Sequence, residues 1–204
     1  MKYLELSIKN VEEETKKLAK IICENKEKID VVIFIARGSY QIGDVISKEL
    51  NCPLLEVFAK RKGNKLKNIF KPFLKIIPSK MKEKLRKVEF NSNFHEKKQD
   101  RIVSYDEKKW KKYIGKQNIL IVDDSVDTGN SMLQVKNVVQ NYFKDSNIKI
   151  AALNCFKKSE KIIKTDYFIY EDTMLNGPWS NDSKYNKEFI KMYNNYKKEN
   201  NNER

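Results

Sequence analysis

The stretch ILIVDDSVDTGNSM, residues 119–132, changes character abruptly after its first four residues. Those four aliphatic residues predict a strand that is buried on both faces of a sheet. Asp123, Asp124 and Asp127 follow, and Gly129 lies among small polar residues that precede a predicted helix. Three carboxylates within five residues repel one another unless a partner compensates their charge. The stretch therefore predicts a ligand site at the end of a buried strand.

Simpler interpretations of this stretch exist. Asp127 or Thr128 could be only an N-cap, with the acids merely ending a strand. A receiver domain has a similar acidic pair that holds Mg²⁺, but it would place this strand near its own start, whereas a strand–helix–strand unit precedes it here. A calcium loop that began at Asp123 would need glycine in place of Thr128 and glutamate in place of Gln134. The receiver and calcium interpretations fail on these grounds.

The fourth interpretation is a site for a sugar phosphate. Adjacent carboxylates at a strand end accept hydrogen bonds from two neighbouring ribose hydroxyls, and they hold Mg²⁺ through water. The following turn supplies backbone N–H groups and hydroxyls at a helix N-terminus, where an anion binds. These groups belong to Thr128, Gly129, Asn130 and Ser131.

Two motifs resemble those of one family. ILIVDDSVDTGNS closely resembles the loop of type I phosphoribosyltransferases that binds phosphoribosyl pyrophosphate (PRPP). IFIARGSYQIG resembles the family's pyrophosphate loop, often built around a cis peptide bond, with Ser39 where glycine is frequent. The resemblance covers roughly residues 3–59 and 117–180. It implies a doubly wound, mainly parallel α/β sheet, the type I phosphoribosyltransferase fold, and transfer of 5-phosphoribosyl from PRPP with release of pyrophosphate.

The resemblance also implies roles for the donor-site residues. Asp123 and Asp124 orient the ribose and hold Mg²⁺, and Asp127 exchanges a proton with the incoming base. Asp127 also belongs to the turn that binds the 5-phosphate, together with Thr128, Gly129, Asn130 and Ser131. Pyrophosphate is assigned to Arg37, Gly38 and Ser39, assisted by Lys60 and Arg61.

The acceptor is indicated by the N-terminal segment and by DYFIYEDTMLNGPW, which look most like the xanthine–guanine and hypoxanthine branch. In that branch a lysine meets the purine 6-oxo group, and Lys157 matches its position, with Lys158 as a substitute. Met174 stands where an aromatic residue normally stacks on the base, and Trp179 is close by. A surface lysine and a core tryptophan are the simpler alternatives for Lys157 and Trp179.

Hydrophobic patterns predict the order of elements along the chain. Apolar runs predict strands at 29–36, 53–59, 118–124, 148–156 and 166–172, and helical spacing predicts helices at 11–24, 42–50 and 132–143. This alternation is typical of a doubly wound α/β fold. We expect one domain over residues 1–193, with an insertion at 60–116, and a low-complexity, disordered tail at 194–204.

The net charge of +14 is concentrated in one segment. Residues 57–117 contain 20 Lys and Arg against 6 Asp and Glu, so the rest of the chain is neutral. Residues 60–87 also repeat apolar residues at helical spacing, interrupted by Pro72 and Pro78, which predicts a basic, partly helical insertion. It could be a solvated lid, lie on an anionic membrane or bind nucleic acid, and Lys60, Arg61 and Lys62 could attract PRPP.

Composition narrows the remaining possibilities. With 40% hydrophobic residues the chain can form a core, and it contains no apolar run of the roughly 20 residues that a membrane span needs. Three isolated cysteines and no apolar leader predict a cytoplasmic protein with reduced thiols. Two alternatives to base transfer stay open: a non-base acceptor such as a glycan or lipid precursor, and a PRPP-sensing regulator that binds nucleic acid. A homodimer is a further possibility.

Overall fold

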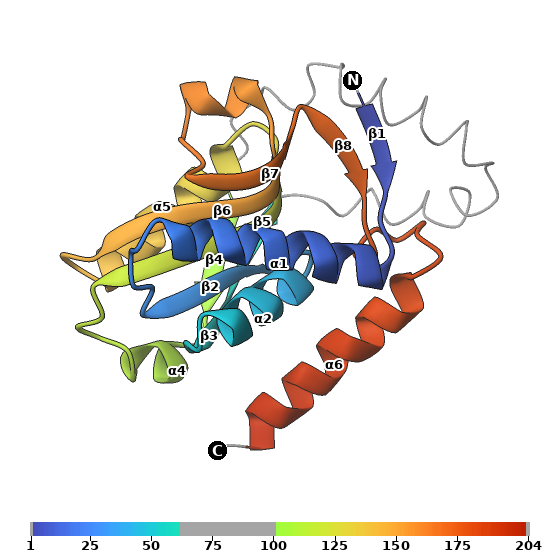
Figure 1. Cartoon of the computed structure of the whole chain (residues 1–204). Coiled ribbons are helices and arrows are strands. Elements are labelled where there is room, and N and C mark those ends of the chain that lie inside the picture. Colours follow the sequence, from blue (N-terminus) through green and yellow to red (C-terminus); the bar gives the residue numbers. More distant parts are fainter. Residues whose placement is uncertain (1, 62–100, 203–204) are drawn as a thin grey trace.

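The computed structural model describes residues 2–61 and 101–202 (Figure 1). In this part of the chain a six-stranded sheet has the order β4–β3–β2–β5–β6–β7, and every neighbouring pair is parallel except β3 and β4. Its strands are β2 (Val31–Ala36), β3 (Leu54–Arg61), β4 (Arg101–Tyr105), β5 (Asn118–Val126), β6 (Asn147–Cys155) and β7 (Tyr167–Glu171). The expected doubly wound, mainly parallel α/β fold is confirmed.

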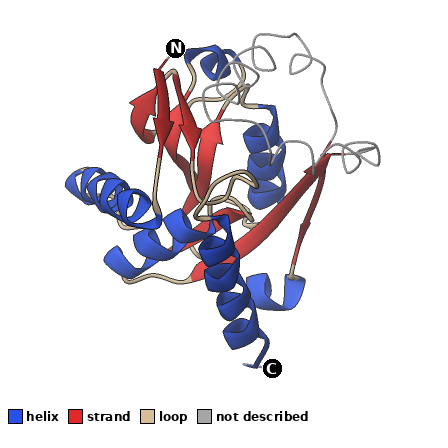
Figure 2. Cartoon of the chain, turned by 90° about the vertical axis from the view of Figure 1, so that its right-hand side faces the viewer, coloured by secondary structure: helices blue, strands red, loops and turns tan. Residues whose placement is uncertain are grey.

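Helices cover both faces of this sheet, as Figure 2 shows from the side. The helices in the described part of the chain are α1 (Ile8–Glu24), α2 (Tyr40–Glu49), α4 (Glu107–Lys111), α5 (Asn130–Tyr142), α6 (Asn186–Asn202) and the 3-10 helix η4 (Lys157–Lys161). Residues of α1 and α2 share one buried cluster with the sheet, and residues of α4 and α5 share another.

Strand β2 explains why both faces need cover. Val31, Ile33 and Ile35 point into the cluster with α5, whereas Val32 faces α1 and α2. Side chains of a strand alternate between the two faces of a sheet, so a continuous aliphatic run is buried only where helices cover both. The predicted strand at 29–36 is therefore confirmed in kind and begins two residues later.

A second, two-stranded parallel sheet pairs β1 (Lys2–Glu5) with β8 (Thr173–Asn176). Figure 1 shows this small sheet standing apart from the main one, at the upper right. Both strands were missed by the hydrophobic pattern because each has only four residues and its partner lies at the far end of the chain. Met174, which the resemblance assigns to the base, lies on this small sheet.

Residues 194–202 differ from the disordered tail that composition predicts, because they continue α6. The helix carries Phe189, Tyr193 and Tyr196 at spacings of four and three residues, which places them on one face. That face packs on Phe34 and Tyr40, with ring centroids 5.6 Å apart for Phe34–Tyr196 and for Tyr40–Tyr193. Aromatic packing against the main domain therefore overrides the polar composition.

The segment 60–116, expected as an insertion, is described only at its two ends. Its first residues lengthen β3, and its last residues form β4 and α4, with Trp110 of α4 stacked on Tyr105 at 4.1 Å between ring centroids. The predicted short helices, and the membrane or nucleic-acid surface proposed for them, lie outside the described residues. None of the described helices is long and apolar enough to cross a membrane.

Candidate active site

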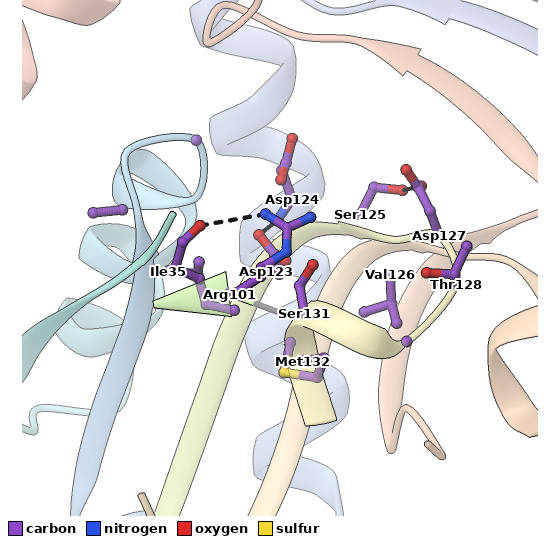
Figure 3. A pocket seen from close by; sticks show the side chains of 14 residues that line it. Ile35, Arg101, Asp123, Asp124, Ser125, Val126, Asp127, Thr128, Ser131 and Met132 are labelled. Carbon is purple, nitrogen blue, oxygen red and sulfur yellow. Dashed lines mark hydrogen bonds between the residues drawn. The ribbon is translucent and has the colours of Figure 1, made fainter. Parts of the chain in front are cut away.

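A cavity of about 250 Å³ opens at the carboxyl ends of β2 and β5 (Figure 3). The chain leaves β2 toward β3 and leaves β5 toward β6, in opposite directions along the sheet. Ligands of open α/β sheets bind at such a reversal of strand order. The cavity is lined by the ends of both strands, by Gly38 and Arg101, and by residues 127–129, 131 and 132. Asn130, also expected at the site, does not line it. The two motifs of the sequence therefore meet in one cavity.

The acidic pair lies at the base of this cavity, on β5. Asp124 donates its backbone N–H to Asp123 Oδ1 at 2.9 Å, and the structure extends β5 through both residues to Val126. Burial, followed by the charge of Asp124, raises the pKa of Asp123 well above its ordinary value. Burial also raises the pKa of Asp124, and the nearby Asp127 adds to the effect. The pair therefore favours a ligand that brings positive charge or hydrogen-bond donors.

The acidic pair can hold Mg²⁺ only if other groups complete the coordination shell of the metal. Within residues 2–61 and 101–202, no group of three or more His, Cys, Asp or Glu side chains is arranged to hold a metal ion. Mg²⁺ usually binds one or two carboxylates and completes its shell with waters and substrate phosphates. Two adjacent carboxylates with raised pKa values suit that arrangement.

The turn after β5 leads directly into α5. Gly129 is the N-cap of α5 and has φ = +79°, a conformation that favours glycine. A Cβ at this position would lie 2.8 Å from Ile163 Cγ2, so the turn also has no room for a larger residue. The first N–H groups of a helix have no partner within it and attract anions. The turn is thus built as an anion site beside the acidic pair.

The loop after β2 approaches the acidic pair from the other side. The Ala36–Arg37 peptide bond is cis. A Cβ on Gly38 would lie 3.3 Å from Asp124 Oδ1, so the absence of a side chain keeps this approach open. Ser39 is buried, and its hydroxyl donates to Ile35 O at 2.7 Å while its amide donates to the same oxygen at 3.4 Å. Ser39 therefore holds the loop in place, and Gly38 lines the cavity.

Four cations lie around this loop, three expected from the sequence and one overlooked. Arg37 and Lys60 are exposed and do not line the cavity, and Arg61 ends β3 opposite Arg101. Arg101 lines the cavity from β4, and its Nη1 donates to Ala59 O at 3.3 Å. Figure 3 draws its guanidinium among the side chains that line the cavity. Sequence reasoning missed Arg101 because it counted this residue within the basic insertion, although the β-branched run RIVSY signals a strand.

The comparison with family models identifies the family of the chain that forms this cavity. Residues 5–179 match the model of the phosphoribosyl transferase domain, which is most of the chain. The chain belongs to the phosphoribosyltransferase family. It is a PRPP-dependent phosphoribosyltransferase, and the resemblance read from its two motifs is confirmed. No curated protein matches it in sequence.

Solved structures share the fold of this phosphoribosyltransferase at low sequence identity. A purine phosphoribosyltransferase from Pyrococcus horikoshii is 20% identical, with a TM-score of 0.59 over 88% of this chain and 95% of that one. A xanthine-guanine-hypoxanthine phosphoribosyltransferase from Helicobacter pylori is 14% identical, with a TM-score of 0.58 over 87% and 93%. A hypothetical protein from Neisseria gonorrhoeae with bound ppGpp is 16% identical, with a TM-score of 0.60 over 95% and 96%.

The residues expected to bind the base do not line the cavity of this phosphoribosyltransferase. Lys157 follows β6, and its exposed ammonium lies 3.0 Å from Glu171 Oε2. A hydrogen bond to that carboxylate raises the pKa of Lys157. Met174 is buried on β8, opposite Tyr3 of β1. Lys157 therefore lies just after β6 and Met174 on the small sheet, and neither lines the cavity.

Trp179 has a clear structural environment. It packs, partly buried, against the cluster under α1 and α2 and against the aromatic cluster of α6. A Cβ on Gly177 would lie only 2.3 Å from Trp179 Cη2, so glycine is needed to accommodate the ring. This environment is that of a core residue, the simpler of the two interpretations made from the sequence.

Proposed function

We propose that this phosphoribosyltransferase transfers the 5-phosphoribosyl group of PRPP to a nucleobase of the 6-oxopurine class. The observation that carries the proposal is the cavity itself, in which an acidic pair, a helix N-terminus and Gly38 converge. The purine class is supported by the sequence likeness to the xanthine–guanine and hypoxanthine branch. Two of the solved structures with this fold are also named as purine enzymes.

In the proposed reaction the protein binds and orients more than it reacts. The turn at 127–131 holds the 5-phosphate, and Asp123 and Asp124 hold the ribose hydroxyls. The loop amides at Gly38 face the pyrophosphate, and the exposed Arg37 beside them adds positive charge from outside the cavity lining. Asp123 and Asp124 would hold Mg²⁺, which would supply positive charge to stabilise the leaving pyrophosphate. The bond from the anomeric carbon to the pyrophosphate oxygen breaks with its electron pair on the oxygen. A ring nitrogen of the base then bonds to that carbon, and its proton passes to Asp127.

The test is pyrophosphate release from PRPP and Mg²⁺ with hypoxanthine, guanine, xanthine, adenine and uracil in parallel. We expect turnover with at least one of the three 6-oxopurines and none with uracil. Asp127→Asn serves as the control for proton transfer. If PRPP binds in calorimetry but no base supports release, the nucleobase is not the acceptor.

A second candidate keeps PRPP as the donor and replaces the base by another acceptor, such as a glycan or lipid precursor. The observation that favours it is the pairing of Lys157 with Glu171, away from the cavity, together with Met174 in place of an aromatic residue. Release of pyrophosphate with such an acceptor but with none of the bases would select it. We also propose that the protein is cytoplasmic and forms a homodimer. Light scattering, which measures the mass of the particle in solution, tests the dimer.

Arg101 supplies a prediction for the donor side of this reaction. Arg101→Ala is expected to raise the KM for PRPP about 10–100-fold, because a charge-assisted hydrogen bond contributes roughly 1.5–3 kcal/mol. Its guanidinium lines the cavity, and its charge suits the pyrophosphate of PRPP. Steady-state kinetics with varied PRPP measures the effect.

Lys116→Ala is the matched control for Arg101→Ala, because it removes one exposed cation just before β5, at the opposite end of the sheet. We expect it to leave the KM for PRPP unchanged. Equal KM values for Arg101→Ala and the wild type would show that Arg101 does not contact PRPP.

A further inference from the structure

Asn154 is a polar residue in a buried strand. It is 0% exposed, and it interrupts the apolar run IAAL of β6 just before Cys155. Burying an amide costs free energy unless both its donor and its acceptor find partners. Its environment therefore explains why a polar side chain is kept there.

The register of the sheet brings Asn154 beside the active-site strand. Ser125 of β5 and Asn154 of β6 are direct partners in the parallel pairing of these strands. Side chains at facing positions of neighbouring strands contact each other. Asn154 Nδ2 donates to Ser125 Oγ at 3.1 Å.

The directions of the hydrogen bonds around Asn154 are fixed by chemistry. The backbone N–H of Thr173 donates to Asn154 Oδ1 at 3.0 Å, and a backbone N–H can only donate. Nδ2 of the amide must then face Ser125. Because the Ser125 oxygen accepts from Asn154, its own hydrogen is available to Asp127 Oδ1, 2.9 Å away. The hydrogen bonds donated by Thr173, Asn154 and Ser125 thus form a chain that runs in one direction, from the small sheet to Asp127.

We infer that Asn154 is a positioning residue for phosphoribosyl transfer, which acts through Ser125 to fix the orientation of the Asp127 carboxylate in the cavity. The inference rests on the proposed function, in which Asp127 takes the proton of the base. Figure 3 shows Ser125 and Asp127 side by side at the rim of the cavity, joined by this bond. Asn154 does not line the cavity, so it acts only through Ser125.

The chain also links the two parts of the site. Thr173 is the first residue of β8 and directly precedes Met174, which the sequence places at the base. Thr173 and Ser125 are both bonded to the amide of Asn154. A displacement of β8 would therefore move this amide and disturb its hydrogen bond to Ser125. The carboxylate that receives the proton is therefore held from the same strand that the base is expected to approach.

The test is a double-mutant cycle between Asn154 and Asp127. Asn154→Leu and Ser125→Ala are each expected to lower kcat about 10-fold, because a misdirected carboxylate loses its alignment with the base. PRPP affinity, measured by calorimetry, is expected to stay within twofold. In an Asp127→Asn background the same two changes should lower kcat by less than twofold, since no carboxylate is left to orient.

Ser146→Ala is the matched control for Ser125→Ala, because the Ser146 hydroxyl also donates a hydrogen bond, to Phe143 O at 2.7 Å, but lies away from the cavity, just before β6 begins. It should lower the melting temperature as Ser125→Ala does, with kcat unchanged. Ser125→Thr retains the hydroxyl and should restore most of kcat.

Two results would separate the inference from the proposed function. If Asn154→Leu and Ser125→Ala lower kcat by the same factor with Asp127 and with Asn at that position, the effect is structural and the inference is wrong. If Asp127→Asn alone keeps wild-type kcat, the proton role proposed for Asp127 fails first, and the positioning role falls with it.

Discussion

Asp127→Asn is expected to lower kcat for phosphoribosyl transfer about 10²–10⁴-fold, the range that a positioned acid or base contributes. The amide has the size of the carboxylate but cannot accept the proton of the base. PRPP affinity should change little, because the proposed function assigns the 5-phosphate to backbone amides of the turn, which the substitution leaves in place. Steady-state kinetics gives kcat, and calorimetry with PRPP and Mg²⁺ gives the affinity.

Asp145→Asn is the matched control for this variant. Asp145 is exposed at the turn between α5 and β6, away from the cavity, and its φ of +64° is one that asparagine also accepts. Its kcat should equal that of the wild type. A wild-type kcat for Asp127→Asn would show that another group, or water, takes the proton.

The acidic cavity at the end of β5 could be predicted from the sequence because its determinants are local. Asp123, Asp124, Asp127 and Gly129 lie within seven residues, directly after a strand whose aliphatic run is unambiguous. Strand ends, caps and glycine turns depend on neighbours in the chain, so their chemistry can be read in order. The structure brings these residues and Gly38 together at one cavity, as expected from parallel strands that end at the same edge.

What the sequence could not supply depends on contacts between distant segments. Arg101 reaches the cavity only because β4 pairs antiparallel with β3, across a segment of about 40 residues. Asn154 meets Ser125 through the register of β5 and β6, which neither strand specifies alone. An asparagine inside an apolar run was nevertheless a visible signal, since a buried amide needs partners.

Helix α6 shows the limit of composition as a guide. Its Asn- and Lys-rich sequence is typical of disorder, yet two contacts anchor it to β3. Glu56 accepts a hydrogen bond from the Tyr193 hydroxyl, and Lys197 Nζ lies 2.5 Å from Glu56 Oε2. Tyr193 also packs on Tyr40, the first residue of α2 after the loop that follows β2. The helix therefore supports the loop that approaches the acidic pair.

Asp123→Asn is expected to abolish measurable transfer and, at the same time, to stabilise the ligand-free protein. The raised pKa of Asp123 means that folding disfavours its ionised form, through burial and the charge of Asp124. Removing that charge should raise the free energy of unfolding at pH 7 and, with it, the melting temperature. Urea and thermal unfolding measure this gain, and Glu49→Gln, which removes an exposed charge at the end of α2, should show none.

The sign of this effect with pH follows from the direction of the shift. Below the ordinary carboxyl pKa of 3.8, Asp123 is protonated in both states, so the variant has no advantage there. As pH rises, the unfolded chain ionises first and the folded wild type loses stability relative to the variant. The gain should therefore grow above pH 3.8 and level off once the raised pKa is passed.

Substrate should reverse the order of stability. PRPP with Mg²⁺ binds the folded wild type and compensates the two carboxylates, so it should raise the wild-type melting temperature above that of Asp123→Asn. The free energy that the acidic pair costs the empty protein is then recovered only when the donor is bound. A variant that is less stable than the wild type without ligand would show that Asp123 supports the fold, and an equal response of both proteins to PRPP and Mg²⁺ would remove Asp123 from the donor site.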